Sequence, residues 1–117
     1  MRLILTPEVL RTSYDYLKST KPFNKWKLPL SDLVEMRVMR YRSLIGQWEY
    51  SAKHHIIGFN EKFIGTTDSL MRAMAHEMIH IAQYELKAQT NNTEHNKDFY
   101  KKIKQVASYH GFDSKWF

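Results

Sequence analysis

The sequence contains no cysteine, only three prolines and four glycines, and no long run of apolar residues. The absence of cysteine excludes disulfides, thiol nucleophiles and cysteine-based zinc sites, so histidine, aspartate or glutamate would have to hold any metal ion. The lack of a long apolar run argues against a membrane-spanning segment. The apolar stretch at residues 1–5 is too short for a secretory signal. We therefore expect an intracellular location, in the cytoplasm or nucleoid, or in the host cell if the chain is viral.

The composition is that of one globular domain. Of 117 residues, 43% are hydrophobic and 14% aromatic, which is enough for a single core. Without a repeat, a low-complexity run or a Gly/Ser linker, residues 1–117 are expected to form a single domain. Six histidines are a high number for this length. The net charge of +6 favours a polyanionic partner, DNA above all, although solubility explains it equally well.

Apolar residues at helical spacing predict three helices. Residues 6–8, Thr-Pro-Glu, form a helix start, and this helix should end before Pro22. A second helix is expected over residues 66–88, with apolar side chains around roughly half of its circumference, so it should be largely buried. The third is expected over residues 96–110, with Gly111 as its C-terminal cap.

Between the first two helices the apolar period changes to that of strands. Alternation predicts strands at residues 34–39, 44–50 and 54–59, with the second able to pair with the first and a bulge at Gly46. We expect a small antiparallel sheet of about three strands. The order of helix, strands, helix and helix gives an α+β fold class.

The second predicted helix carries the pattern HExxH at residues 76–80. His76 and His80 lie one turn apart on the same face, where two imidazoles can bind one metal ion, and Glu77 lies beside them. Chance would produce this pattern only about 0.02 times in a chain of this composition. The alternative, two solvated surface histidines, is disfavoured because the helix is too apolar to be mostly exposed. A polar strip lining a cleft is expected instead.

A catalytic zinc ion needs a third protein ligand and leaves its fourth position to water. Downstream candidates are Glu85, Glu94, His95, Asp98 and His110. Glu85 should point away from the histidine pair, and His110 shares an apolar helix face and should pack in the core. Glu94 and His95, in the polar loop before the last helix, remain as alternatives.

The histidine spacing resembles that of a known family. HExxH at residues 76–80, then fourteen residues, then His95, and Phe99 four residues later, resembles the SprT-like metalloproteases, the family of the DNA–protein crosslink protease Spartan. The resemblance covers roughly residues 44–109. It implies a minimal zincin-like core that binds one Zn²⁺ per chain through His76, His80 and His95.

Two features depart from that family. Many members carry glycine after the third ligand, where this chain has Asn96, and many add a zinc ribbon with cysteine pairs. We therefore expect a bare catalytic core, such as a virus or a mobile element would encode. The resemblance also implies protein substrates associated with DNA.

The same residues suggest a mechanism. Zinc lowers the pKa of water to about 7, and Glu77 is the expected general base that takes up the proton and passes it to the leaving amine. A second electrophile is expected, but the sequence does not identify it. His54 and His55 point to opposite faces of a strand, so one of them could reach the cleft, although ordinary strand histidines are the simpler interpretation.

Basic residues gather in three groups. Single-stranded DNA is the favoured nucleic-acid partner, because lysines can contact its phosphates while interleaved aromatic side chains stack on its bases. The simpler interpretations are a solvated helix face for the lysines and, for Trp26, a place in the core or in the connector, the basic and aromatic segment at residues 21–31. The first group is a stripe on the last helix, formed by Lys97, Lys101 and Lys104. The second group surrounds Phe23 in the connector and comprises Lys18, Lys21, Lys25, Trp26 and Lys27. The third group lies in and just after the first predicted strand and comprises Arg37, Arg40 and Arg42.

The sequence thus favours a zinc-dependent peptidase that acts on protein substrates near DNA. One alternative is a DNA-binding module whose zinc site is structural or vestigial. Glu77 argues against it, because a purely structural site has no use for that carboxylate. Another alternative is a zinc peptidase unrelated to DNA.

Overall fold

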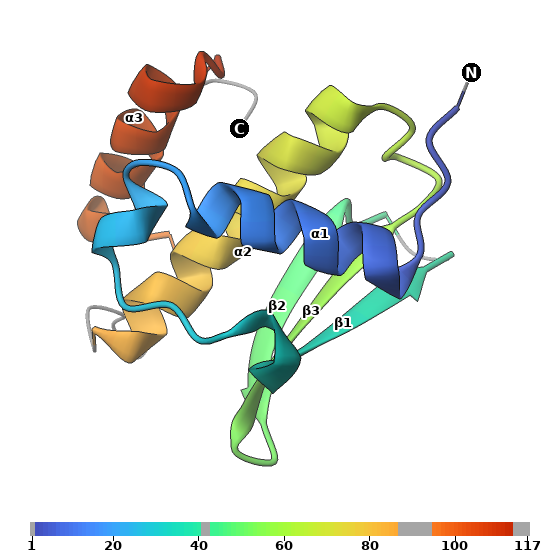
Figure 1. Cartoon of the computed structure of the whole chain (residues 1–117), viewed down its shortest axis with the longest axis horizontal. Helices are drawn as coiled ribbons and strands as arrows, with labels where there is room; N and C mark the ends of the chain where they lie inside the picture. Colours follow the sequence, from blue (N-terminus) through green and yellow to red (C-terminus); the bar gives the residue numbers. More distant parts are fainter. Residues whose placement is uncertain (1, 41–42, 87–94, 114–117) are drawn as a thin grey trace.

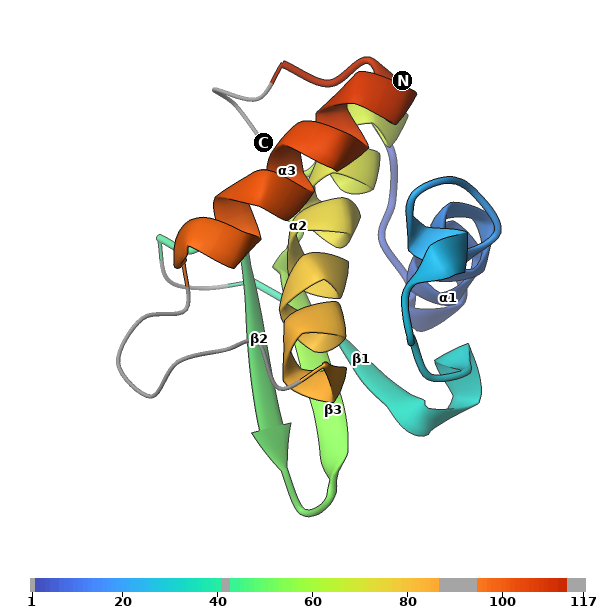
Figure 2. The same ribbon diagram turned by 90° about the vertical axis from the view of Figure 1, so that its left-hand side faces the viewer.

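The computed structural model describes residues 2–40, 43–86 and 95–113. Helices α1 and α2 pack on one face of a three-stranded sheet, and α3 packs against α2 on the side away from α1 (Figures 1 and 2). This arrangement confirms the predicted α+β class. The elements in chain order are α1 (Pro7–Lys18), η1 (Phe23–Lys25), η2 (Ser31–Leu33), β1 (Val34–Met39), β2 (Gly46–Ser51), β3 (His54–Asn60), α2 (Thr67–Glu85) and α3 (Lys97–His110), where η marks a short 3-10 turn.

Side-chain caps fix the helix starts where the sequence predicts them. The Thr6 hydroxyl accepts a hydrogen bond from the backbone of Val9 at 3.1 Å, and Thr66 forms a capping box with Ser69. Gly111 ends α3 in the left-handed conformation at φ 76°. α2 ends at Glu85 rather than at the predicted residue 88. Every helix in the described part of the chain is too short or too polar to cross a lipid bilayer.

The strands form a mixed sheet in the order β1-β3-β2, so the prediction of an antiparallel sheet was wrong. β2 pairs antiparallel with β3 through a hairpin, but β1 pairs with the other edge of β3 and runs parallel to it. The physical reason is burial. β3 is buried from His55 onward, and the central place in the sheet is the one in which both edges of a strand form backbone hydrogen bonds with neighbouring strands. β1 and β2 therefore lie on opposite edges of β3. β2 keeps an unbroken register from Gly46, without the predicted bulge.

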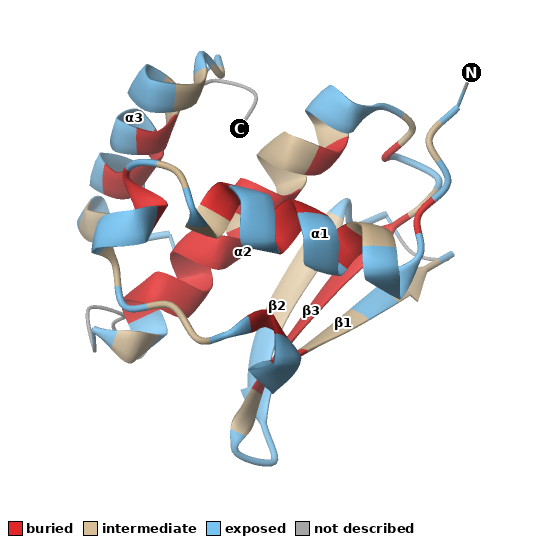
Figure 3. Ribbon diagram, viewed as in Figure 1, coloured by how far each residue is buried: buried red, intermediate tan, exposed pale blue. Residues whose placement is uncertain are grey.

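The hydrophobic core lies between the sheet and the helices. On the helix-facing side of the sheet, Val34 and Ile57 belong to one buried cluster with Met74 and Met78 of α2 and Leu10 of α1. Figure 3 shows buried residues following β3 and most of α2. The predicted burial of the second helix is thus confirmed. It gives the metal motif a rigid base, because a packed helix holds its side chains in fixed directions.

Candidate metal centre

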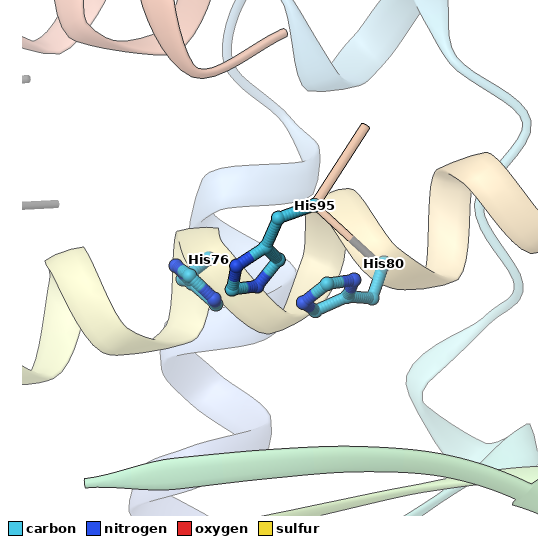
Figure 4. A group of neighbouring side chains, drawn as sticks. All are labelled: His76, His80 and His95. Atoms are coloured by element: carbon cyan, nitrogen blue, oxygen red, sulfur yellow. The ribbon is translucent and has the colours of Figure 1, made fainter. Parts of the chain in front are cut away.

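Three histidine rings converge on one side of α2. His76 and His80 project from successive turns of the helix, and His95 comes from the segment that leads into α3 (Figure 4). One ring nitrogen from each histidine lies within 4.8 Å of the others. Two elements that are separated in sequence therefore bring three potential nitrogen ligands to one point.

The environment of His80 favours an uncharged ring. Its side chain is only 3% exposed and stacks against Phe99 at 4.7 Å and Trp48 at 5.7 Å between ring centroids. Burial, reinforced by the neighbouring His76 and His95, lowers the pKa of His80 to about 3. A neutral imidazole keeps a lone pair, which is the form that binds metal ions.

Glu77 is buried next to this cluster and is only 5% exposed. Its carboxylate faces the start of β2, where a β-carbon on Gly46 would lie 3.0 Å from Glu77 Oε2. Glu77 and His76 both line a pocket of about 440 Å³ that extends from the metal helix toward residues 43–46. The carboxylate thus lies between the histidines and a cavity large enough for part of a substrate.

The residues fit a zinc ion on two observations. The ring nitrogens are close enough for small side-chain rotations to bring them onto one ion, and three histidines with an open fourth position form a catalytic zinc set. In addition, His80 Nδ1 is buried without a hydrogen-bond partner in the described structure. A buried polar atom without a partner costs free energy, so it calls for an explanation. Binding of a metal ion by this ring, with a small adjustment of the side chain, would supply one.

A comparison with models of protein families identifies the family of the chain. A model of the SprT-like family matches residues 14–115. The chain belongs to the SprT-like family. A search of curated protein sequences gave no significant match. In this SprT-like protein the matched range contains all three histidines and Glu77, so the resemblance seen in the sequence is confirmed.

The other predicted ligand candidates lie elsewhere. Glu85 pairs with His55, and the ring of His110 lies 2.9 Å from the Thr20 hydroxyl, between α3 and the connector. His110 is half-buried against Phe23 rather than fully in the core. Asp98 hydrogen-bonds Lys102 and Gln83. Glu94 lies outside the described residues, so the choice of His95 rests on its place in the cluster.

A partly buried chain of hydrogen bonds supports His80 from the sheet side. The Trp48 indole N–H donates to His55 Nδ1 at 3.0 Å, so the neutral His55 ring carries its hydrogen on Nε2 and donates it to Glu85 Oε1, also at 3.0 Å. Both nitrogens of His55 are thereby engaged. His54 lies on the outer face and pairs with Glu35. The two strand histidines thus have structural partners, as the simpler interpretation of the sequence held.

Sequence reasoning did not identify Trp48 as part of this site. The signal was available in β2, where alternate residues Gly46, Trp48 and Tyr50 face α2, opposite Phe59, Ile57 and His55 of β3. A glycine followed by aromatic residues on one face of a strand indicates a surface shaped around another element.

A second network holds the start of α3 against α2. The side-chain amide of Gln83 donates to Asn96 at 2.9 Å and to Asp98 at 3.0 Å, and Lys102 donates to both oxygens of Asp98 at 2.8 Å. Partial burial raises the pKa of Asp98, but the hydrogen bonds from Lys102 and Gln83 outweigh this effect, and the net pKa is lowered. Because Asn96 follows His95 directly, this network also fixes the direction from which His95 approaches.

The predicted DNA-contact lysines are exposed. Those of α3 lie opposite its buried face, and those of the connector lie in or beside η1: Lys97, Lys101, Lys104, Lys21, Lys25 and Lys27. Trp26 is half-buried, packs edge-on against Phe23 at 5.3 Å, and lies under Lys102, whose Nζ is 5.5 Å from the ring centroid. Of the arginine group, Arg37 pairs with Glu35 and Arg40 with Glu61, and Arg42 lies outside the described residues.

Proposed function

We propose that this SprT-like protein is a zinc-dependent peptidase that hydrolyses peptide bonds in protein substrates. The observation that carries the proposal is the convergence of His76, His80 and His95 beside the buried carboxylate of Glu77. A structural zinc site has no role for such a carboxylate, whereas a hydrolytic site requires one. Family membership supports the same activity, because SprT-like proteins are typically zinc metallopeptidases.

Each residue then has a defined task. His76, His80 and His95 hold one zinc ion, which when bound acts as a Lewis acid, lowering the pKa of water to about 7 and polarising a carbonyl group. A carboxylate oxygen of Glu77 accepts a proton from the attacking water and delivers it to the nitrogen of the leaving amine. The burial of Glu77 favours this role, because bulk water does not screen the electrostatic interactions of its carboxylate.

Metal analysis together with hydrolysis of a denatured protein tests this proposal. The purified protein should contain about one zinc ion per chain, and His95→Ala should release it. His110→Ala is the matched control, because that histidine lies at the far end of α3 and should leave the zinc content unchanged. Loss of zinc from Glu94→Ala, with retention by His95→Ala, would show that the third ligand is misassigned.

Glu77→Gln tests the general base. The variant should keep its fold and its zinc but lose about 10²–10⁴-fold in hydrolysis, which is the usual contribution of such a base. Hydrolysis at the rate of the unmodified protein would mean that another group takes the proton.

We also propose that the substrates are proteins bound to DNA, with single-stranded DNA favoured. Support comes from the contact between Trp26 and Lys102, because it holds the connector and its lysines next to α3, which carries the first lysine group. Hydrolysis with and without single-stranded DNA tests this proposal. An activity indifferent to DNA would favour a peptidase unrelated to DNA. DNA binding without any hydrolysis would favour a DNA-binding module with a structural zinc site.

A further inference from the structure

The pocket beside Glu77 is built from apolar side chains of three separate segments. Its apolar lining comes from the segment just before β2, from the loop after β3 and from the first half of α2: Leu44, Ile45, Phe63 and Ala73. Three of these are large hydrophobic side chains that remain exposed, Leu44 at 47%, Ile45 at 55% and Phe63 at 49%. Exposed apolar groups that gather around a cavity indicate a binding surface, whereas isolated ones do not.

The volume and position of the pocket define what could occupy it. About 440 Å³ is ample for one large side chain, since a cavity of about 150 Å³ already holds a benzene ring. Because His76 and Glu77 form one wall, any group in the pocket lies next to the reacting atoms of the proposed hydrolysis.

The charges around the pocket argue against a charged occupant. Arg72 lines it and pairs with Asp68 at 3.0 Å, and Glu77 is the one carboxylate among the lining residues that the structure describes. A basic substrate side chain would be attracted by Glu77 but repelled by Arg72, and an acidic one the reverse, so the lining favours neither sign of charge. Both would also lose hydration against the apolar wall without a dedicated partner.

We infer that this pocket binds a bulky apolar side chain, such as that of leucine, methionine or phenylalanine, from the substrate residue next to the cleaved bond. The inference rests on the proposed peptidase function and adds a substrate class to it. Leu44, Ile45, Phe63 and Ala73 are its specificity-determining residues. Gly46 contributes by leaving the entrance beside Glu77 open, since a side chain there would project toward the carboxylate.

Cleavage of a mixed peptide library, with products identified by mass spectrometry, tests the inference. The zinc-loaded protein should cleave mainly where one flanking position holds a bulky apolar residue. Ala73→Leu narrows the pocket by projecting a bulky side chain into it, and it should lower the ratio of kcat/KM for a leucine-containing peptide to that for its alanine analogue by about tenfold or more, the range for apolar pockets that lose the space of a few methylenes. Leu33→Ala is the control, because Leu33 is an exposed apolar residue of η2 outside the pocket.

A binding measurement separates this inference from the proposed function. N-acetyl-phenylalanine amide should shift the Ala73 methyl resonance in NMR spectra, and N-acetyl-lysine amide should not. A library cleaved without preference, an unchanged ratio in Ala73→Leu, or equal shifts with both amides would overturn the apolar pocket while leaving the peptidase intact. Selective binding of the phenylalanine amide without zinc-dependent cleavage of any peptide would support the pocket and remove the peptidase.

Discussion

Gly46 of β2 lies directly against Glu77 of α2, and a β-carbon at position 46 would be 3.0 Å from Glu77 Oε2 and 3.3 Å from the carbonyl oxygen of Gly58. Separations this short are tighter than ordinary van der Waals contact, so a larger residue would shift the carboxylate or the neighbouring strand by a few tenths of an ångström. Glu77 is buried, with one side bordering the pocket of about 440 Å³. The glycine therefore lets the edge strand approach the proposed general base without displacing its carboxylate.

Gly46→Ala is predicted to impair catalysis more than folding. The added methyl group requires the Glu77 carboxylate to shift by a few tenths of an ångström, and a misplacement of about 1 Å can cost roughly 100-fold in rate, so the loss here should be smaller. We expect kcat to fall by about 2–10-fold with zinc content retained, as measured by steady-state hydrolysis and metal analysis. Gln47→Ala, on the opposite face of the same strand, is the control and should have little effect. Full activity of Gly46→Ala would show that the carboxylate tolerates the contact.

The support of His80 by Trp48 and His55 leads to a second prediction. Trp48→Ala removes the stacked ring and His55→Ala removes the anchor of that ring, so both should weaken zinc binding by about 10–100-fold, the usual effect of groups that orient a metal ligand. Trp48→Phe keeps a ring but loses the N–H group, and it should lie between Trp48→Ala and the unmodified protein. Competition with a chromophoric chelator measures the affinity. If all three variants bound zinc as tightly as the unmodified protein, this network would contribute only ordinary core packing.

Much of this architecture follows from local sequence signals. HExxH fixed the positions of His76 and His80, and the capping residues Thr6, Thr66 and Asn96 marked the helix starts, because these features depend on residues within one or two turns. The choice of His95 over Glu94 needed a family resemblance. The distance between α2 and the segment before α3 depends on packing, which a local pattern does not encode.

The sheet order shows where local signals fail. Alternation located all three strands but not their partners, and the preference for pairing neighbours suggested an antiparallel meander. The deciding factor was that β3 is buried along nearly its whole length and must occupy the centre. The roles of Trp48, His55 and Gln83 were hidden for a related reason, because each acts through a contact with a residue distant in the sequence.

The hairpin between β2 and β3 contains two strained residues. Ala52 and Lys53 adopt positive φ angles of 51° and 68°, a conformation that favours Asn-Gly in two-residue hairpin turns. Replacing them with Asn and Gly together should stabilise the fold by about 1 kcal/mol and raise Tm by roughly 4 °C. Calorimetry measures the change. Lys62→Gly, at an exposed site outside the residues with positive φ, is the control and should lower Tm. A double variant that melts below the unmodified protein would show that the turn is unstrained.

Binding of DNA through the lysines of α3 should depend on salt, and the packing of Trp26 allows its effect on stability to be separated from its effect on binding. If the lysines of α3 contact phosphates, replacing Lys97, Lys101 and Lys104 with glutamine should flatten the dependence of log K on log salt by about 2, since each phosphate contact on a single strand contributes about 0.7. Zinc content should not change. Trp26 is held between Phe23 and Lys102, so the main effect of Trp26→Ala should be a lower Tm, with a smaller effect on the free energy of binding to single-stranded DNA. A base-stacking role would instead cost about 1–3 kcal/mol of binding free energy. Binding that does not depend on salt would remove DNA from the function and leave the peptidase, which depends on the histidines and Glu77 rather than on charge.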